Sequence, residues 1–202
     1  MAATILSSGP KADSRAARVV SEGGLLVYPT DTVYGLGCDP LDSAAVERLF
    51  VAKGRGAKAV PVLCANIGKA EELVELSTSA LELARKHWPG ALTIVAPLVR
   101  GVPELLHQGT GKLGVRVPGS ASCIRLIREC GGILVGTSAN VSGRPSCRTA
   151  EEAMSQLGSL VDLIIDGGRL EGRESTVVEV TGDDIIILRK GSVGVYDKET
   201  DR

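Results

Sequence analysis

Apolar residues follow two patterns along this chain, continuous runs and helical spacing. Continuous apolar runs bounded by glycine, proline or polar residues predict buried strands at residues 25–28, 60–63, 92–96, 115–117, 133–135, 160–165, 176–180 and 185–188. Helical spacing and capping residues predict helices at 13–22, from Asp42 or Ser43 to 51, within 68–87 as one helix or two, at about 121–129, and from Thr149 through Met154.

The order of these elements predicts the fold class. Helices and strands intermix throughout, and the last strands follow one another across short turns, so we expect an α/β protein. Its sheet should be twisted and mixed, parallel in part with antiparallel pairs near the end. The 202 residues contain no proline- or serine-rich linker and no repeat. One domain over residues 1–202 is therefore expected.

Composition limits the function classes. A hydrophobic fraction of 44% is ample for a core and excludes global disorder. The 23 Lys and Arg residues against 24 Asp and Glu exclude a protein that binds polyanions by bulk charge, so a phosphate must be bound by a local cluster. Aromatic residues make up only 2% of the chain, which argues against a stacking platform for single-stranded nucleic acid.

Cysteine and terminal patterns predict a cytoplasmic protein. The chain has five cysteines with no C-x-x-C pair, so neither a disulfide framework nor a zinc site is indicated. The two histidines exclude a histidine-rich metal site, and we expect no metal-ligating residues. The first residues lack the features of a signal peptide, and no apolar run approaches the ~20 residues of a membrane span.

Two familiar nucleotide-binding motifs are excluded by context. Residues 109–114 match G-x-G-x-x-G, but an extended segment follows where the dinucleotide fold needs a helix. The same stretch fails as a P-loop because Leu113 stands in place of Ser or Thr. The chain also lacks the G-x-S-x-G turn of many serine hydrolases.

Three polar loops remain, each at the end of a predicted strand, where ligands bind in open α/β sheets. They cover residues 28–37, 52–58 and 136–143. Each loop alone also fits a purely structural role: a strand-to-helix connection, a solvated helix end, or a turn favoured by Ser, Asn and Gly.

Together the loops carry motifs in a specific order. Lys53-Gly54-Arg55 fits a K-x-R signature, Ser138-Ala139-Asn140 fits S-x-N, and residues 29–37 read P-T-D-T-V-Y-G-L-G. Further matches lie at residues 89–93, 115–118, 175–178 and 188–191. In these motifs, from about residue 12 to 194, the chain resembles the YrdC/Sua5 family, the threonylcarbamoyl-AMP synthases.

The resemblance implies a fold, a reaction and partners. The fold is a twisted α/β sheet with flanking helices around a concave cavity, in a short form without the C-terminal domain of long Sua5 proteins. The reaction condenses L-threonine, bicarbonate and ATP, with Mg²⁺ accompanying ATP, into threonylcarbamoyl-AMP and pyrophosphate. A downstream transferase then modifies adenosine 37 of tRNA. Catalysis would rest on positioning and charge stabilisation, without a protein nucleophile.

The resemblance also assigns site residues. The catalytic set is Lys53, Arg55, Ser138 and Asn140. The ATP-binding set is Lys53, Arg55, Ala59, Lys112, Ser138, Ser146 and Arg189. The L-threonine-binding set is Thr32, Cys64, Arg116, Gly136 through its backbone, and Ser175. Ala59 and Cys64 depart from the family, which often has a longer side chain at the first position and histidine at the second.

Three alternatives stay open at this point. A carbamoyl-adenylate-forming carbamoyltransferase domain would carry the same fold. A module that binds double-stranded RNA or tRNA weakly would use the concave basic surface, and an inactive domain would explain the two departures. In the synthase interpretation Lys53 and Arg55 are exposed loop cations, so their replacement by alanine should abolish adenylate formation and leave the fold intact.

Overall fold

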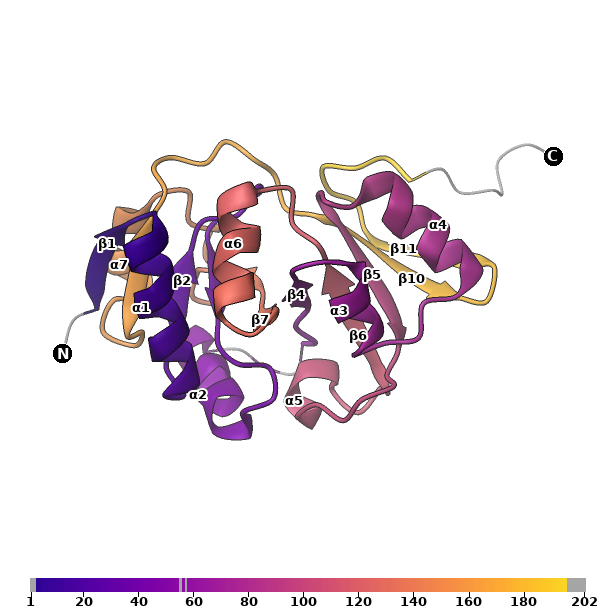
Figure 1. Cartoon of the computed structure of the whole chain (residues 1–202), viewed down its shortest axis with the longest axis horizontal. Coiled ribbons are helices and arrows are strands. Elements are labelled where there is room, and N and C mark those ends of the chain that lie inside the picture. Colours follow the sequence, from indigo (N-terminus) through magenta and orange to yellow (C-terminus); the bar gives the residue numbers. More distant parts are fainter. Residues whose placement is uncertain (1–2, 55, 57, 196–202) are drawn as a thin grey trace.

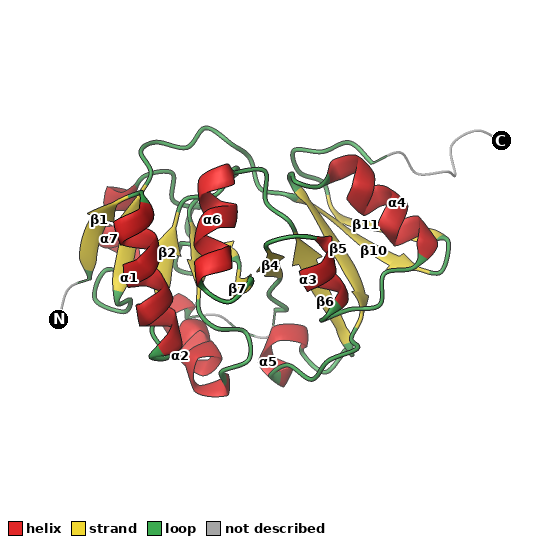
Figure 2. Ribbon diagram, viewed as in Figure 1, coloured by secondary structure: helices red, strands yellow, loops and turns green. Residues whose placement is uncertain are grey.

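The computed structural model describes residues 3–54, 56 and 58–195. The strands form two sheets with helices packed around them (Figures 1 and 2). The five-stranded sheet consists, in spatial order, of β1 (Thr4–Ser7), β9 (Leu163–Asp166), β2 (Leu26–Tyr28), β3 (Gly35–Gly37) and β8 (Thr137–Ser138). The six-stranded sheet consists of β11 (Asp184–Arg189), β10 (Thr176–Thr181), β5 (Leu92–Pro97), β6 (Lys112–Arg116), β4 (Val62–Cys64) and β7 (Ile133–Val135).

Both sheets mix parallel and antiparallel pairing, which confirms the predicted fold class. In the first sheet β9 lies parallel to both β1 and β2, and β3 is antiparallel to both its neighbours. In the second sheet β10 and β5 are parallel, as are β4 and β6, and the other pairs are antiparallel. The strands are divided between two sheets rather than gathered into the one that the pattern suggested.

With one exception, the helices match the sequence pattern closely. They are α1 (Pro10–Ser21), α2 (Ser43–Lys53), α3 (Ile67–Glu71), α4 (Thr78–His87), α5 (Glu104–His107), α6 (Ala121–Glu129) and α7 (Ala150–Leu157). Residues 68–87 form two helices rather than one. The side chains of Asp42, Ser77, Ser120 and Thr149 accept backbone N–H groups at their helix starts, as N-caps do. Within the described residues no helix is both long and apolar enough to cross a membrane.

Four elements escaped the sequence pattern because each is short. Strand β8 has two residues, and β3 is a Gly-Leu-Gly segment with little strand propensity of its own. Strand β1 is an edge strand of four residues and α5 a single helical turn. Such elements depend on their neighbours in space rather than on local periodicity.

The two sheets meet where β7 continues directly into β8 through Gly136. Val135 ends the strand in the six-stranded sheet and Thr137 begins the strand in the five-stranded sheet. The hydroxyl of buried Tyr28 donates to the Val135 carbonyl at 2.8 Å. A Cβ atom on Gly37 would lie 2.3 Å from that same carbonyl oxygen, so this close approach requires glycine.

The junction generates a first prediction, that Gly37→Ala destabilises the fold. The added methyl group would overlap the Val135 carbonyl between two sheets that cannot easily separate, at a cost of about 2 kcal/mol or more. Gly101→Ala is the matched control because no atom lies within 4 Å of its added Cβ, and it should change stability by less than about 0.5 kcal/mol. Urea denaturation of both variants measures the difference, and equal midpoints would contradict the tight junction.

Candidate functional site

A cavity of about 390 Å³ opens between the two sheets. Its wall combines residues of both sheets and of the loops that join them: Thr30, Thr32, Val33, Tyr34, Gly35, Ala59, Val60, Pro61, Leu63, Thr93, Val95, Thr110, Lys112, Gly114, Arg116, Gly136, Thr137, Ser138, Glu174, Ser175, Val177, Glu179, Leu188 and Arg189. Of the thirteen predicted site residues, eight belong to this wall: Thr32, Ala59, Lys112, Arg116, Gly136, Ser138, Ser175 and Arg189.

Strand alternation positions most of the cavity side chains. Lys112, Gly114 and Arg116 are alternate residues of β6, and each lines the cavity. Their neighbours Leu113 and Val115 are buried in the core. The same alternation puts Thr93 and Val95 of β5, and Val177 and Glu179 of β10, on the cavity side. One face of three adjacent strands is therefore the ligand-facing face.

Arg116 forms a buried cationic centre at the carboxyl end of β6. Only 5% of this residue is exposed. Its guanidinium donates to the Gly90 carbonyl at 2.8 Å, to Asp31 Oδ1 at 2.5 Å and, more distantly, to Thr32 Oγ1 at 3.4 Å. The Thr32 hydroxyl also lies 3.0 Å from that of Thr30. Because a guanidinium has five N–H groups, it retains donors for a ligand carboxylate beside these hydroxyls.

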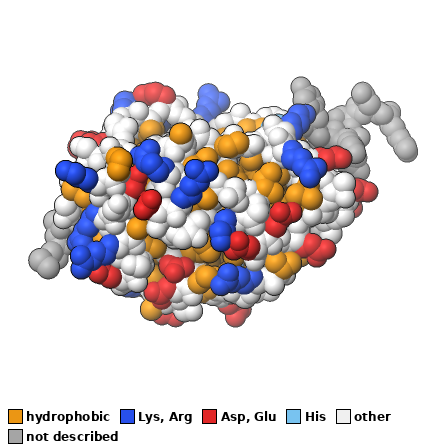
Figure 3. Space-filling model, viewed as in Figure 1, with side chains coloured by type: hydrophobic (Ala, Val, Ile, Leu, Met, Phe, Trp, Pro, Cys, Tyr) orange, Lys and Arg blue, Asp and Glu red, His pale blue; other side chains and the backbone are white. Residues whose placement is uncertain are grey.

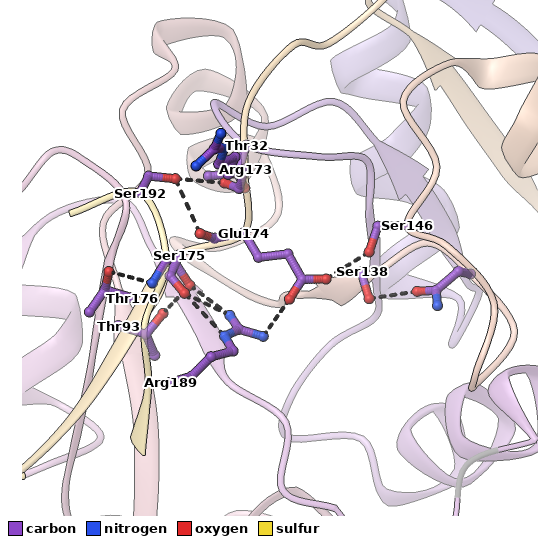
Figure 4. A network of polar contacts seen from close by, with 12 residues as sticks. Thr32, Thr93, Ser138, Ser146, Arg173, Glu174, Ser175, Thr176, Arg189 and Ser192 are labelled. Carbon is purple, nitrogen blue, oxygen red and sulfur yellow. Dashed lines mark hydrogen bonds and ion pairs between the residues drawn. The ribbon is translucent and has the colours of Figure 1, made fainter. Parts of the chain in front are cut away.

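A second polar cluster surrounds Ser175 on the same wall (Figure 4). The Ser175 hydroxyl lies 2.9 Å from Thr93 Oγ1 and accepts a hydrogen bond from Arg189 at 3.1 Å. Arg189 also donates to the Ser175 carbonyl and, at 2.8 Å, to Glu174 Oε2. Because Ile94 pairs with Val115 in an antiparallel ladder, Thr93 faces Arg116 across the strands. The Thr93–Ser175 hydroxyl pair thus lies between the two arginines.

The third cation of the cavity, Lys112, lies at the other end of β6. Its ammonium group is 2.5 Å from Glu179 Oε1. Across the cavity, on β8, the Ser138 hydroxyl donates to Asn140 Oδ1 at 2.6 Å. Arg116, Arg189 and Lys112 are therefore each paired with a carboxylate, those of Asp31, Glu174 and Glu179.

Lys53 is not the exposed loop cation that we expected. It ends α2 and is 1% exposed, and its ammonium group donates to the carbonyl oxygens of Ser138 and Asn140 at 2.5 and 2.9 Å. Lys53 is not among the residues of the cavity wall, and its ammonium group contacts backbone carbonyls of the loop that carries Ser138. The backbone carbonyl of Lys53 also accepts from Ser142 N–H at 2.8 Å.

Asn140 organises the same loop from within. Its amide nitrogen donates to the Arg144 carbonyl at 2.6 Å and to the Val141 carbonyl at 3.1 Å. Its Oδ1 accepts from Ser138, and Asn140 itself is buried and stands outside the cavity wall. Its amide group therefore orients the backbone of the loop.

Cys64 also lies away from the cavity. Leu63 precedes it on β4 and faces the cavity, so alternation turns Cys64 into the hydrophobic core, where it is fully buried. Burial raises the pKa of its thiol to about 12, so the thiol is neutral at physiological pH. The expectation that Cys64 contacts threonine is not supported by this placement.

The remaining predicted residues occupy varied positions. Ser146 lies just outside the wall and donates to Glu174 Oε1 at 2.7 Å. Ala59 is exposed and lines the cavity, whereas Arg55 lies outside the described residues. The N–H of Gly136 donates to the Pro61 carbonyl at 2.9 Å, so the backbone group that it offers to a ligand is its own carbonyl.

Sequence reasoning missed several polar residues of the wall: Thr30, Thr93, Glu174 and Glu179. Alternation was a usable signal for one of them. Once Ser175 is assigned to the site, the period of two that continues from Ser175 along β10 selects Glu179. Glu174 had no such signal, because its role depends on Ser146 and Arg189, which are distant in sequence.

Metal-ligating chemistry is limited in the part of the chain that the structure describes. It contains no group of three or more His, Cys, Asp and Glu side chains that could hold a metal ion. The carboxylates of the cavity are instead paired with cations. A metal ion here would be one that a phosphate ligand carries with it.

The fold and the cavity define an α/β protein with a polar ligand site between two sheets. The family model for Sua5/YciO/YrdC proteins, described as "Telomere recombination", matches residues 18–191. The chain belongs to this family. The N-terminal and C-terminal limits of the match agree with the extent of the motifs in the sequence.

Curated relatives and a solved structure give the same result. The chain is 37% identical over 91% of its length to the threonylcarbamoyl-AMP synthase of Pyrococcus abyssi and covers 55% of that protein. It is 42% identical over 86% of its length to a putative threonylcarbamoyl-AMP synthase of Mycobacterium tuberculosis and covers 81% of it. A crystal structure of P. abyssi Sua5 complexed with L-threonine superimposes with a TM-score of 0.89 at 35% identity, over 93% of this chain and 57% of the other.

The placement of Lys53 generates a second prediction, on stability. Lys53→Ala should lower the free energy of unfolding by about 2–4 kcal/mol, because it removes a buried ammonium donor from the carbonyls of Ser138 and Asn140. Lys86→Ala is the matched control, since Lys86 also lies in the last turn of a helix but is exposed, and it should change stability by less than about 0.5 kcal/mol. Equal denaturation midpoints for the two variants would contradict this stabilising role and would favour Lys53 as an exposed phosphate contact.

Proposed function

We propose that this chain is an L-threonylcarbamoyladenylate synthase, which forms threonylcarbamoyl-AMP and pyrophosphate from L-threonine, bicarbonate and MgATP. The observation that carries the proposal is the presence, in one cavity, of a buried arginine among hydroxyl groups and of two further cations along the same strands. The first group suits a hydroxylated amino acid, and the second suits a polyphosphate. Membership of the family and the names of the relatives support the same reaction.

The amino acid binds at the Arg116 end in this proposal. The guanidinium takes the α-carboxylate through its fork, which a lysine could not do. Asp31 orients the guanidinium through its ion pair. The hydroxyls of Thr32 and Ser175 lie in the same region and are partners for the substrate hydroxyl. A site with such hydrogen-bonding groups rejects amino acids that lack the hydroxyl, because its own groups would then stay unpaired.

The triphosphate of ATP binds along Arg189, Ser138 and Lys112. Charge moves onto the departing pyrophosphate as the α-phosphorus is attacked, and these groups stabilise that charge. Lys53 contributes by fixing the loop that presents Ser138. Mg²⁺ arrives as part of MgATP, bound to the phosphates.

The chemical steps need positioning rather than a protein nucleophile. The threonine amine attacks CO₂ derived from bicarbonate and forms a carbamate. A carbamate oxygen then attacks the α-phosphorus, and the bond to the β,γ-pyrophosphate breaks. Neutral buried thiols and a tyrosine, Tyr34, whose pKa burial raises to about 12, offer no competing nucleophile in or beside the cavity.

The product defines the downstream partner. A transferase acting on adenosine 37 of tRNA consumes the adenylate in this proposal, and the reaction takes place in the cytoplasm. Tight binding of RNA by this chain is not favoured, because Lys and Arg side chains are interspersed with Asp and Glu over the face in Figure 3 and the net charge is -1. The tRNA therefore meets the transferase, and this chain supplies the small molecule.

The direct experiment incubates the protein with MgATP, bicarbonate and one amino acid, and measures pyrophosphate release and the mass of the adenylate. We expect a product that requires both threonine and bicarbonate, with serine and valine as poorer substrates. A product formed with carbamoyl phosphate instead would indicate the carbamoyltransferase. Absence of any product, together with salt-sensitive binding of double-stranded RNA, would indicate the binding module.

A third prediction concerns Arg116. Arg116→Lys should raise KM for threonine by roughly tenfold to a hundredfold and change KM for ATP far less, because the forked contact with the carboxylate is lost. Arg125→Lys is the matched control: Arg125 also lies 2.5 Å from an aspartate oxygen, that of Asp13, but outside the cavity. Steady-state kinetics with each substrate varied in turn measures both constants. An equal rise in both KM values would contradict a threonine-specific role.

A further inference from the structure

Glu174 places a negative charge in a cavity that we propose to bind polyphosphate. It lies directly before Ser175, at the end of the segment that joins β9 to β10. Its side chain extends between Ser146 and Arg189 (Figure 4). One carboxylate oxygen accepts from the Ser146 hydroxyl at 2.7 Å, and the other accepts from the Arg189 guanidinium at 2.8 Å.

The two donors come from different parts of the fold. Ser146 lies in the loop between β8 and α7, beside the five-stranded sheet, and Arg189 ends β11 of the six-stranded sheet. Phosphoryl oxygens accept hydrogen bonds from guanidinium and hydroxyl groups as carboxylate oxygens do. A phosphate bound to both donors would therefore replace both hydrogen bonds of Glu174.

The exposed fractions indicate which carboxylate of the wall can move aside. The Arg116–Asp31 side chains are 6% and 17% exposed, and the Lys112–Glu179 side chains 34% and 24%. The Arg189–Glu174 side chains are 47% and 42% exposed. Opening the last pair returns its charges to water at the least cost, because exposed ion pairs contribute little. Glu174 is thus the carboxylate that an incoming polyanion displaces.

We propose that Glu174 is an internal competitor for polyphosphate, occupying Ser146 and Arg189 whenever no phosphate is bound there. This inference rests on the proposed function, which supplies the polyphosphate. Glu174 keeps the two donors aligned in the empty cavity and lowers the affinity for polyphosphate. When pyrophosphate has formed, the returning carboxylate takes its place on Arg189 and favours its release. Glu174 thereby sets how tightly the product is held.

Binding of inorganic pyrophosphate, measured by isothermal titration calorimetry, tests this proposal without any turnover. Glu174→Gln should bind pyrophosphate about fivefold more tightly than the unaltered protein, the size expected when an exposed competing pair is removed. Glu174→Ala should shift the affinity in the same direction. In steady-state turnover, inhibition by pyrophosphate should strengthen by the same factor.

Glu171→Gln is the matched control. It removes the same charge from the same segment, but Glu171 is exposed and contacts Arg169 and Arg148 rather than the cavity. An equal gain in affinity for this variant would mean a general electrostatic effect and would overturn the proposal. Weaker or unchanged binding by both Glu174 variants would also overturn it, because Glu174 would then only position Arg189.

The synthase assay on the same preparations separates this inference from the proposed function. Tighter pyrophosphate binding by the Glu174 variants, in a protein that forms no adenylate, would support the competitor and contradict the synthase. Adenylate formation together with unchanged pyrophosphate binding by those variants would contradict the competitor alone. Thermal unfolding monitored by circular dichroism confirms that each variant is folded.

Discussion

The cavity depends on the close contact of two sheets at a single continuous stretch of chain. Strand β7 leaves one sheet and becomes β8 of the other with only Gly136 between them. A Cβ atom on Gly136 would lie 2.4 Å from Leu63 Cγ, and Gly37 lies against the Val135 carbonyl as closely. The cavity lies between the two sheets, and its wall includes Gly136 and Leu63 from this contact.

The same geometry explains how the wall carries charged and hydroxyl side chains although the strands are mostly apolar. Strands β5, β6 and β10 each turn alternate residues toward the core and toward the cavity. On β10, Val178 is fully buried while Glu179, its neighbour, reaches Lys112. The hydrophobic side stabilises the sheet, and the other side is free to carry chemistry. Core and site therefore share strands without sharing faces.

Local pattern was sufficient for the longer elements and insufficient for everything that depends on distant pairing. The buried runs and the capped helices were predictable because burial and capping leave their mark within a few residues. The division into two sheets was not, because β10 pairs with β5 more than eighty residues earlier in the chain. The motif that contains Lys53 marked the right region, yet the burial of its ammonium group follows from where α2 ends relative to the loop at Ser138. Cys64 was misplaced for a simpler reason, since its neighbour Leu63 takes the cavity side of β4.

Charge pairing is what most distinguishes this cavity from a simple basic pocket. Each of Arg116, Arg189 and Lys112 faces a carboxylate, so the cavity avoids the repulsion that would arise among unpaired cations. The pairs differ in burial, and that difference assigns their roles. The buried Asp31–Arg116 pair is costly to open, so Asp31 can hold the Arg116 guanidinium in position for one end of a small ligand. The half-exposed Glu174–Arg189 pair opens cheaply, so it can exchange its carboxylate for an incoming anion. Because each cation has a carboxylate partner, the same cavity can hold the Arg116 guanidinium firmly and bind an anion reversibly at Arg189.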